Sequence, residues 1–341
     1  MAYTTIDNPE LYFQTKLYSG NDTDDHAITL DGDENMSPNL VWIKSRALTH
    51  NHQIHDTVRG VTKHISSDVT NAEATEATGL KSFDSDGFTL GTWDSVNVAS
   101  SGTYVAWCWK AGTTSGISGS PDITPESYSF NATSGFSIIK FTGTNSNATL
   151  PHGLGVAPSL IMTKGLATTE GWGVGGKHLN NWNNYISLNG NYGGWDDVTM
   201  WNDTAPTSTL FTVGTGNITN DNELIIAYCF APIQGFSSIG AYTGNGNADG
   251  PMIVTGMKPS WVMVKRTGDT GKWFIQDNKR DGYNATYKSM IANTSGAEDT
   301  NSTALSIDYL SNGFKLRNSY SELNTSGDTY IYMAFAEAPF V

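Results

Sequence analysis

The sequence predicts an almost all-β protein that consists of three tandem antiparallel β-sandwich modules. Three observations support this prediction. Gly, Asn, Ser and Thr are plentiful and Trp and Tyr are frequent, whereas the helix formers Glu, Lys and Leu are sparse. Apolar residues occur in short runs separated by turn-forming residues, as is typical of strands. The same landmarks also recur three times in the same order, which indicates three copies of one unit.

The first two landmarks of each repeat are a glycine turn and a strand that begins at a proline. The turns are LYSGN (17–21), FTGTN (141–145) and AYTGN (241–245). The strands are PNLVWIK from Pro38, PSLIMTK from Pro158 and PSWVMVK from Pro259. We expect each pair to occupy the same place in its module.

The last two landmarks are a short strand and a longer apolar strand that closes the repeat. The short strands are DGFTL (86–90), TLFTV (209–213) and NGFKL (312–316). The closing strands are TYVAWCW to Trp109, ELIIAYCF to Phe230 and TYIYMAF to Phe335. Each repeat is therefore expected to form a sandwich of about 100 residues that buries one face of each sheet.

These landmarks divide the chain into three repeats. Repeat 1 comprises residues 1–112, with a short N-terminal docking arm, repeat 2 residues 135–233 and repeat 3 residues 234–341. Residues 113–134 are rich in Gly, Ser and Thr and are expected to form a linker. Repeats 2 and 3 adjoin almost directly, so we expect a tight pair of these two and a more separable repeat 1.

The charge and the cysteines restrict the partners. The formal net charge of −14 argues against binding of nucleic acid, since phosphate contacts need clustered Lys and Arg. No apolar run approaches the ~18 residues of a membrane-spanning helix, so we expect no membrane insertion. The start, MAYTTIDNPELYF, predicts no secretion signal. Cys108 and Cys229 lie in apolar runs and are expected to be buried free thiols rather than a disulfide.

Three histidines near a carboxylate, in THNHQIHDTVRG (49–60), suggest a metal site. Aligning repeat 1 with repeat 3 replaces His50, His52 and His55 by Gly271, Trp273 and Gln276. Repeat 3 thus forms the same strand without histidine. On an extended strand His55 would also point away from the other two. We therefore predict no metal and no other cofactor.

The aligned repeats 1 and 3 share the pattern Ile-x-Asp-x-x-Arg. The residues are Asp56 with Arg59 and Asp277 with Arg280, whereas repeat 2 has Gly176 at the aspartate position. One interpretation is a polar functional site. The alternative that we favour is an ion pair or turn contact at the end of the strand.

Catalytic motifs are missing from the sequence. It contains no P-loop, no G-x-S-x-G elbow and no pattern of paired carboxylates for sugar hydrolysis. The acidic stretches NDTDD (21–25) and DGDEN (31–35) do not complete a calcium-binding loop and are expected to be turns. We predict a protein that is not an enzyme.

The most distinctive segment, residues 171–203, sets aromatic residues among Asn and Gly. Aromatic faces flanked by amides and carboxylates suit sugar rings. Trp172 is expected in the core, because it aligns with Trp273. The candidate ligand-binding residues lie in Gly- and Asn-rich turns and are Trp182, Tyr192, Trp195 and Asp196.

Several long stretches resemble proteins of tailed phages that infect marine bacteria, including cyanophages. They are GFSIIKFTGTNSNATLPHGLGVAPSLIMTK (135–164), WNDTAPTS (201–208), YTGNGNADGPMIVTGMKPSWVMVKRTGDTGKW (242–273) and LSNGFKLRNS (310–319). The resemblance implies a virion component, often described as tail-fibre-like or host-recognition protein, with concanavalin-like or jelly-roll β modules. It implies no catalytic residues.

Composition and resemblance together predict a structural protein of the virion, assembled in the host cytoplasm and exposed on the particle. The first hypothesis is a tail-associated appendage that contacts a host glycan or receptor and other virion proteins. The alternative is a capsid decoration or connector protein that binds virion subunits alone, and a polysaccharide depolymerase ranks third. The three modules could mimic a trimer within one chain, or the chain could form a homo-oligomer.

Overall fold

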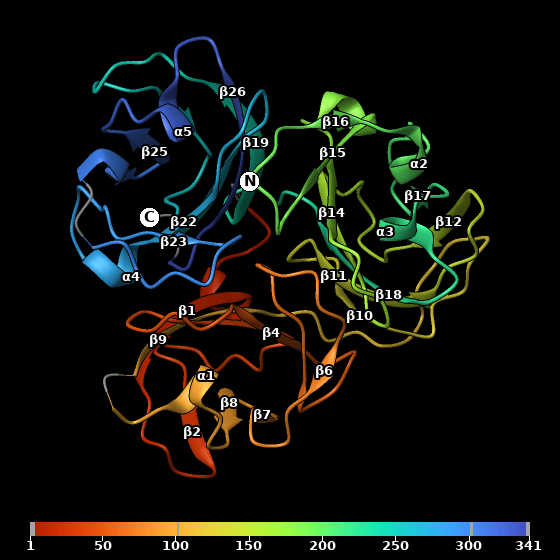
Figure 1. Cartoon of the computed structure of the whole chain (residues 1–341), viewed down its shortest axis with the longest axis horizontal. Coiled ribbons are helices and arrows are strands. Elements are labelled where there is room, and N and C mark those ends of the chain that lie inside the picture. The colour runs from red at the N-terminus through yellow and green to blue at the C-terminus, as the bar shows by residue number, and fades with distance from the viewer. Residues whose placement is uncertain (1–3, 101, 301–302, 339–341) are drawn as a thin grey trace.

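The computed structural model describes residues 4–100, 102–300 and 303–338. Nearly all regular structure is antiparallel β-sheet, and the helices are single turns. Figure 1 shows three lobes around a common centre, in the order repeat 1 (red to orange), repeat 2 (green) and repeat 3 (blue). The prediction of an all-β protein is therefore confirmed.

Repeat 1 has a four-stranded sheet, β1-β9-β3-β4, a three-stranded sheet, β2-β8-β7, and the small pair β5-β6. A one-turn 3-10 helix, η1 (Pro9–Leu11), precedes them and a short helix, α1 (Asp94–Asn97), precedes the closing strand. The strands are β1 (Phe13–Ser19), β2 (His26–Thr29), β3 (Leu40–Ser45), β4 (Gln53–Asp56), β5 (Lys63–His64), β6 (Ala74–Thr75), β7 (Leu80–Asp84), β8 (Gly87–Leu90) and β9 (Thr103–Trp109).

Repeat 2 has a seven-stranded sheet, β10-β11-β18-β13-β14-β15-β16, and the pair β12-β17. The strands are β10 (Ser127–Asn131), β11 (Phe136–Thr142), β12 (Ala148–Pro151), β13 (Leu160–Gly165), β14 (Trp172–Gly176), β15 (Asn184–Ser187), β16 (Trp195–Asp196), β17 (Leu210–Val213) and β18 (Leu224–Phe230). The helical turns are η2 (Asn180–Trp182), α2 (Val198–Trp201) and α3 (Asn217–Asn220).

Repeat 3 has a five-stranded sheet, β19-β26-β21-β22-β23, and a three-stranded sheet, β20-β25-β24. The strands are β19 (Ser237–Thr243), β20 (Met252–Val254), β21 (Trp261–Arg266), β22 (Trp273–Asp277), β23 (Met290–Ile291), β24 (Ile307–Leu310), β25 (Gly313–Leu316) and β26 (Thr329–Phe335). The helical turns are α4 (Asn278–Asp281), η3 (Thr303–Leu305) and α5 (Ser321–Asn324).

The central strands of each large sheet are buried on both faces. In β9, Val105, Trp107 and Trp109 point to the centre of the molecule. The alternate residues Ala106 and Cys108 point into the core between the two sheets of repeat 1. Strands β18 and β26 alternate in the same way between the central core and the core of their own repeat. Two buried faces explain why the closing strands are almost continuously apolar.

The two cysteines lie on the faces of these strands that point away from the centre. Cys108 and Cys229 are fully buried free thiols, as predicted. Burial raises the pKa of both thiols well above the usual value, which leaves them protonated and unreactive at neutral pH.

A buried asparagine in each repeat holds the glycine turn against the short helix. Asn97 accepts a hydrogen bond from the Asn21 amide and donates to the carbonyls of Thr23 and Gly91. Asn220 and Asn324 make corresponding contacts. The turn approaches so closely that a Cβ on Gly20, Gly143 or Gly244 would lie 1.9 to 2.2 Å from a carbonyl oxygen. These contacts explain why the turn recurs in the sequence.

The lysine one residue before the end of each proline-started strand is also buried. Its ammonium group donates to carbonyls of the following hairpin, and burial lowers its pKa to about 8 in all three repeats. The residues are Lys44, Lys164 and Lys265, bonded for example to the carbonyls of Ser45, Gly165 and Gly271. The repeated lysine therefore has a structural role at the hairpin.

Two expectations about domain organisation differ from the structure. Residues 113–134 are not a free linker, because β10 joins the sheet of repeat 2 and Ile123 lies in its core. Repeat 1 is not more separable than the others, since its residues form part of one central core with repeats 2 and 3. The composition of the segment indicated a linker, but its alternating SYSFN run pairs with β11.

The N-terminal arm packs against the start of repeat 3 and the central core. Thr4 donates a hydrogen bond to the carbonyl of Gln234, Ile6 lies in the central core, and Tyr12 packs edge-on against Phe236. The first three residues of the arm lie outside the described part of the chain.

Candidate functional site

The histidines and the repeated tryptophans lie between the repeats. His52, Trp172 and Trp273 occupy the same position, opposite the buried lysine of each repeat. Each side chain contacts a carbonyl of a neighbouring repeat at 2.8 to 3.0 Å. The pairs are His52 with Ile291, Trp172 with Ser66 and Trp273 with Ser187. The contacts run in one sense around the centre and join the repeats into a ring.

A ring of backbone hydrogen bonds reinforces these contacts. In each repeat, the carbonyl two residues after the buried lysine accepts from an amide of the neighbouring repeat. The pairs are Arg46 with Glu298, Leu166 with Glu73 and Thr267 with Gly194. These symmetric contacts show that the three repeats are arranged with approximate threefold symmetry.

The Asp–Arg pairs belong to the same junction. Asp56 pairs with Arg59 at 2.5 Å and accepts from the hydroxyl of Tyr228 in repeat 2 at 2.7 Å. Asp277 pairs with Arg280 at 2.7 Å and accepts from the indole of Trp107 in repeat 1 at 3.0 Å. The side chains of both pairs are fully buried. The interpretation as structural ion pairs is confirmed.

Repeat 2 lacks this polar network, and residues without a charge stand at all three of its positions. Gly176 takes the place of the aspartate and Leu179 that of the arginine, and Met333 takes the place of the donor from the neighbouring repeat. Leu179 and Met333 both lie in the central core. The apolar replacement is self-consistent, because losing only one partner would leave a buried charge unpaired.

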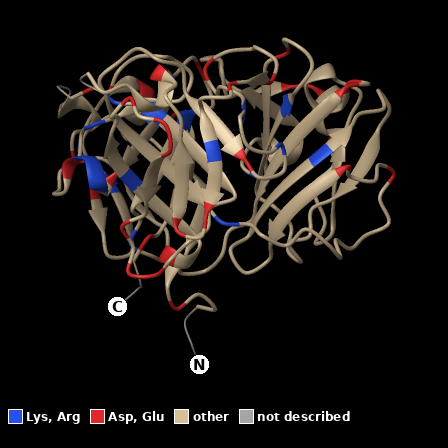
Figure 2. Cartoon of the chain, turned by 90° about the horizontal axis from the view of Figure 1, so that it is seen from below, with Lys and Arg blue, Asp and Glu red and all other residues tan. Residues whose placement is uncertain are grey.

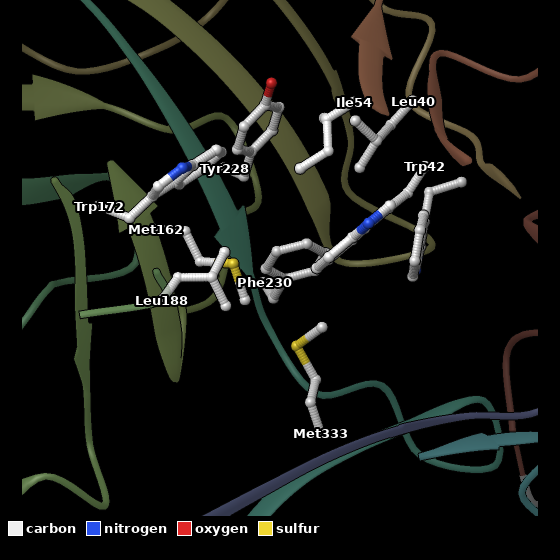
Figure 3. Close-up of a pocket in the computed structure, with 10 residues that line it drawn as sticks. Leu40, Trp42, Ile54, Met162, Trp172, Leu188, Tyr228, Phe230 and Met333 are labelled. Carbon is white, nitrogen blue, oxygen red and sulfur yellow. The ribbon is translucent and has the colours of Figure 1, made fainter. Parts of the chain in front are cut away.

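The centre of the molecule is closed and apolar. Figure 3 shows Trp42, Met162, Tyr228, Phe230 and Met333 converging there from the three repeats. The cavity that they help to line has a volume of about 20 Å³, enough for one water-sized molecule. It is therefore a small packing gap and too small for a ligand site.

His50, His52 and His55 lie in three different environments. His52 lies at the junction, His55 bonds the carbonyl of Lys63 within repeat 1, and His50 lines a surface pocket. Among the described residues, no group of three or more His, Cys, Asp or Glu side chains is placed to hold a metal ion.

The pocket beside His50, which we call the repeat 1 pocket, is a polar hollow of about 300 Å³. Its volume lies at the lower end of the ~300 to 1,000 Å³ that is usual for small-ligand sites. Trp93, at the N-cap of α1, and His64 on β5 form an aromatic wall, with ring centroids 4.6 Å apart. The amide side chains of Asn51, Gln53 and Asn71 line the remainder.

The repeat 1 pocket is uncharged at neutral pH. None of its lining residues is Asp, Glu, Lys or Arg. Burial, with the nearby Arg59 guanidinium, lowers the pKa of His64 to about 4, and burial lowers that of His50 as well. In Figure 2, by contrast, Asp and Glu are spread over the loops, with Lys and Arg interspersed. The pocket is thus a neutral site on a strongly acidic protein.

Two polar atoms in the wall of this pocket have no hydrogen-bond partner in the protein. They are Oε1 of Gln53 and Nδ1 of His64. A buried polar atom that stays unpaired costs about 1 to 3 kcal/mol.

The predicted aromatic residues of repeat 2 are partly brought together. Tyr192 and Trp195 are 62% and 56% exposed, and their ring centroids lie 5.8 Å apart. Asp196 is exposed beside Trp195 on β16. Tyr185, Tyr192 and Trp195 line a shallow hollow of about 40 Å³, which we call the repeat 2 aromatic surface, and Asp196 is not part of its lining.

Trp182 does not belong to this surface, so that prediction was wrong. The side chain is 2% exposed and packs edge-on against Trp201 in the core of repeat 2. Backbone φ angles are positive at Asn180, Asn181 and Trp182, so the chain turns sharply there and the indole is carried inward. Trp172, predicted as core, is fully buried.

The repeat 1 pocket and the repeat 2 aromatic surface occupy equivalent places. His64 pairs with Ala74 across β5 and β6, and Tyr185 pairs with Trp195 across β15 and β16. The pair β5–β6 lies beside β4, because Ile65 is bridged to Ile54, and the pair β15–β16 lies beside β14, the equivalent strand of repeat 2. The sequence missed the repeat 1 pocket, because Trp93 and His64 are 29 residues apart and only the fold joins them.

Comparisons with known proteins provide a family but no activity. A family model described as a domain of unknown function (DUF7483) matches residues 8–339. No curated protein and no solved structure gives a significant match. Among the described residues, no helix is long and apolar enough to cross a membrane.

Proposed function

We propose that this chain, which belongs to the DUF7483 family of unknown function, binds glycans. The observation that carries this proposal is the repeat 1 pocket, which combines an aromatic wall with neutral hydrogen-bonding groups. A sugar ring has apolar C–H faces and a rim of hydroxyls, so it fits both features. A ligand with a net charge would find no counter-ion among the lining residues.

The chemistry of the pocket favours binding without hydrolysis. Glycoside hydrolysis usually requires two carboxylates on either side of the scissile bond. No Asp or Glu belongs to the lining of the repeat 1 pocket. Binding is therefore the function that its side chains support.

We further propose that this glycan belongs to a bacterial host and that the protein is a tail-associated component of a tailed-phage virion. The resemblance of the sequence to marine phage proteins supports this assignment, as does the set of three sheet pairs, which we assign to jelly-roll or concanavalin-like modules. Two equivalent sites in one rigid chain would also strengthen attachment, because the second contact forms at high effective concentration.

Replacing Trp93 with alanine is expected to weaken glycan binding about 30-fold. The indole is the largest apolar surface of the repeat 1 pocket, and removing such an anchor costs about 2 kcal/mol. The measurement is binding of the purified chain to an array of neutral bacterial oligosaccharides.

Trp195→Ala should lower the retention of the protein on surfaces densely coated with glycan, where both sites can bind. It should lower the affinity for a single soluble oligosaccharide less.

The matched control is Tyr320→Ala, because Tyr320 begins the equivalent helix of repeat 3 but does not line the pocket. This variant should bind the array like the unmodified chain. Equal binding by Trp93→Ala would refute the assignment of the pocket. If the chain binds no glycan or host cell but binds virions that lack it, the alternative role in capsid decoration or as a connector replaces the proposed one.

A further inference from the structure

A second polar cavity lies on repeat 3, away from the two equivalent sites. It has a volume of about 230 Å³ and lies where α4 and the loop after it meet β24. Lys258, Asn278, Tyr283 and Tyr309 provide its functional groups. We call it the repeat 3 cavity. Its volume is suited to one small ring rather than to a large ligand.

Two polar atoms of the repeat 3 cavity lack a partner in the protein. Tyr309 is 5% exposed and its hydroxyl makes no hydrogen bond, and Oδ1 of Asn278 is also unpaired. Burial raises the pKa of Tyr309 well above its usual value, so the hydroxyl is a donor at neutral pH. Both residues line the cavity, so a ligand that reached the two groups would meet one donor and one acceptor.

Both unpaired groups are held in fixed positions. Asn278 is the first residue of α4, directly after the fully buried Asp277. The side chain of Asn284 accepts from the amide of Tyr309 and donates to its carbonyl, which ties the loop to β24. The cavity is therefore built by tertiary contacts on both sides.

The charge at the cavity is positive. Lys258 is exposed and takes part in none of the ion pairs found among the described residues. The neighbouring carboxylates are already engaged: Asp277 pairs with Arg280 and Asp281 pairs with Lys288. A ligand with a single negative charge would therefore have one free cation to contact.

We infer that the repeat 3 cavity binds a sugar unit that carries a carboxylate, such as a uronate. Lys258 contacts the carboxylate, the Tyr309 hydroxyl donates to a ligand oxygen and Asn278 accepts from a sugar hydroxyl. Tyr283, which is 86% exposed at the edge, covers the ring. The unpaired acceptor disfavours a bare anion such as phosphate, because two acceptors would face each other. This inference rests on the proposed glycan-binding function.

The test compares two ligands that differ only in the carboxylate, methyl β-glucuronide and methyl β-glucoside. Each is titrated into the full chain, and binding is followed by NMR at the resonances of Tyr283, which lines the repeat 3 cavity, so that binding at the repeat 1 pocket is not counted. We expect the glucuronide to bind at least tenfold more tightly, and Lys258→Gln to remove this preference. Tyr309→Phe should also weaken glucuronide binding about tenfold. Its unliganded chain should melt no lower than the unmodified one, since it loses only an unpaired buried hydroxyl.

The matched control is Lys272→Gln, at an exposed lysine of repeat 3 that does not line the cavity, and it should leave glucuronide binding unchanged. A glucuronide affinity that is insensitive to Lys258→Gln, or no higher than that of the glucoside, would overturn the inference. Acetate binding as tightly as the glucuronide would show a carboxylate site without sugar recognition. If Trp93→Ala abolishes binding of neutral glycans while the glucuronide does not bind, the proposed function stands and this inference fails.

Discussion

Replacing Asp56 with alanine is expected to lower the free energy of unfolding by about 3 to 5 kcal/mol. The Arg59 side chain is fully buried and its nearest carboxylate belongs to Asp56, so the variant leaves a buried guanidinium largely uncompensated. Its other carboxylate contact, Glu73, lies 3.5 Å away, and the hydroxyl of Tyr228 also loses its acceptor. Urea unfolding of the purified chain measures the change.

The protein offers its own control for this prediction. The triple variant Asp56→Gly, Arg59→Leu and Tyr228→Met copies the residues that repeat 2 and its neighbour carry at the equivalent positions. A buried ionic network replaced as a unit by apolar residues is often neutral in stability. We expect the triple variant to lie within about 2 kcal/mol of the unmodified chain. A triple variant less stable than Asp56→Ala would show that the networks are not interchangeable.

Acidification is expected to unfold the protein steeply between about pH 6 and pH 4. Burial is the main cause that lowers the pKa of four histidines, to about 3 for His52 and His55 and about 4 for His64 and His152. Unfolded histidine titrates near pH 6.5. These groups therefore stabilise the fold fully above pH 6.5, and this stability is lost as the pH falls toward their folded pKa values.

Two carboxyl groups act in the opposite direction. Burial raises the pKa of Asp68 to about 6 and that of Glu337 to about 7, so the folded state holds their protons at higher pH than the unfolded state. Unfolding in this range therefore takes up about two protons net. The free energy of unfolding consequently falls by about 3 kcal/mol for each unit by which the pH is lowered. Urea midpoints measured across this range give the slope.

The repeat provides a variant that removes one histidine from this balance. His52 accepts from the indole of Trp42 and contacts the carbonyl of Ile291, and the equivalent pairs are Met162 with Trp172 and Met263 with Trp273. The double variant Trp42→Met and His52→Trp copies these pairs. It should reduce the slope by about 1.4 kcal/mol per pH unit. An unchanged slope would show that His52 does not contribute to the acid transition.

The candidate sites were predictable only in part. Tyr192, Trp195 and Asp196 could be identified, because exposed aromatic residues are conspicuous among Gly and Asn. The same pattern failed at Trp182, since three successive positive φ angles turn its indole inward. The repeat 1 pocket and the repeat 3 cavity could not be found in the sequence. Their walls come from strands, hairpins and helices that are distant along the chain.

The sequence by itself determined the all-β class, the presence of three repeats and the contact between Asp and Arg at the strand end in repeats 1 and 3. Strand periodicity and turn residues are local properties, and an internal repeat can be compared with itself. Only the tertiary structure decided that the three repeats close around one core and that residues 113–134 belong to repeat 2. It also decided which residues contact each other between repeats. The physical reason is that the central strands of each large sheet are buried on both faces, and an apolar strand does not specify which neighbour covers its second face.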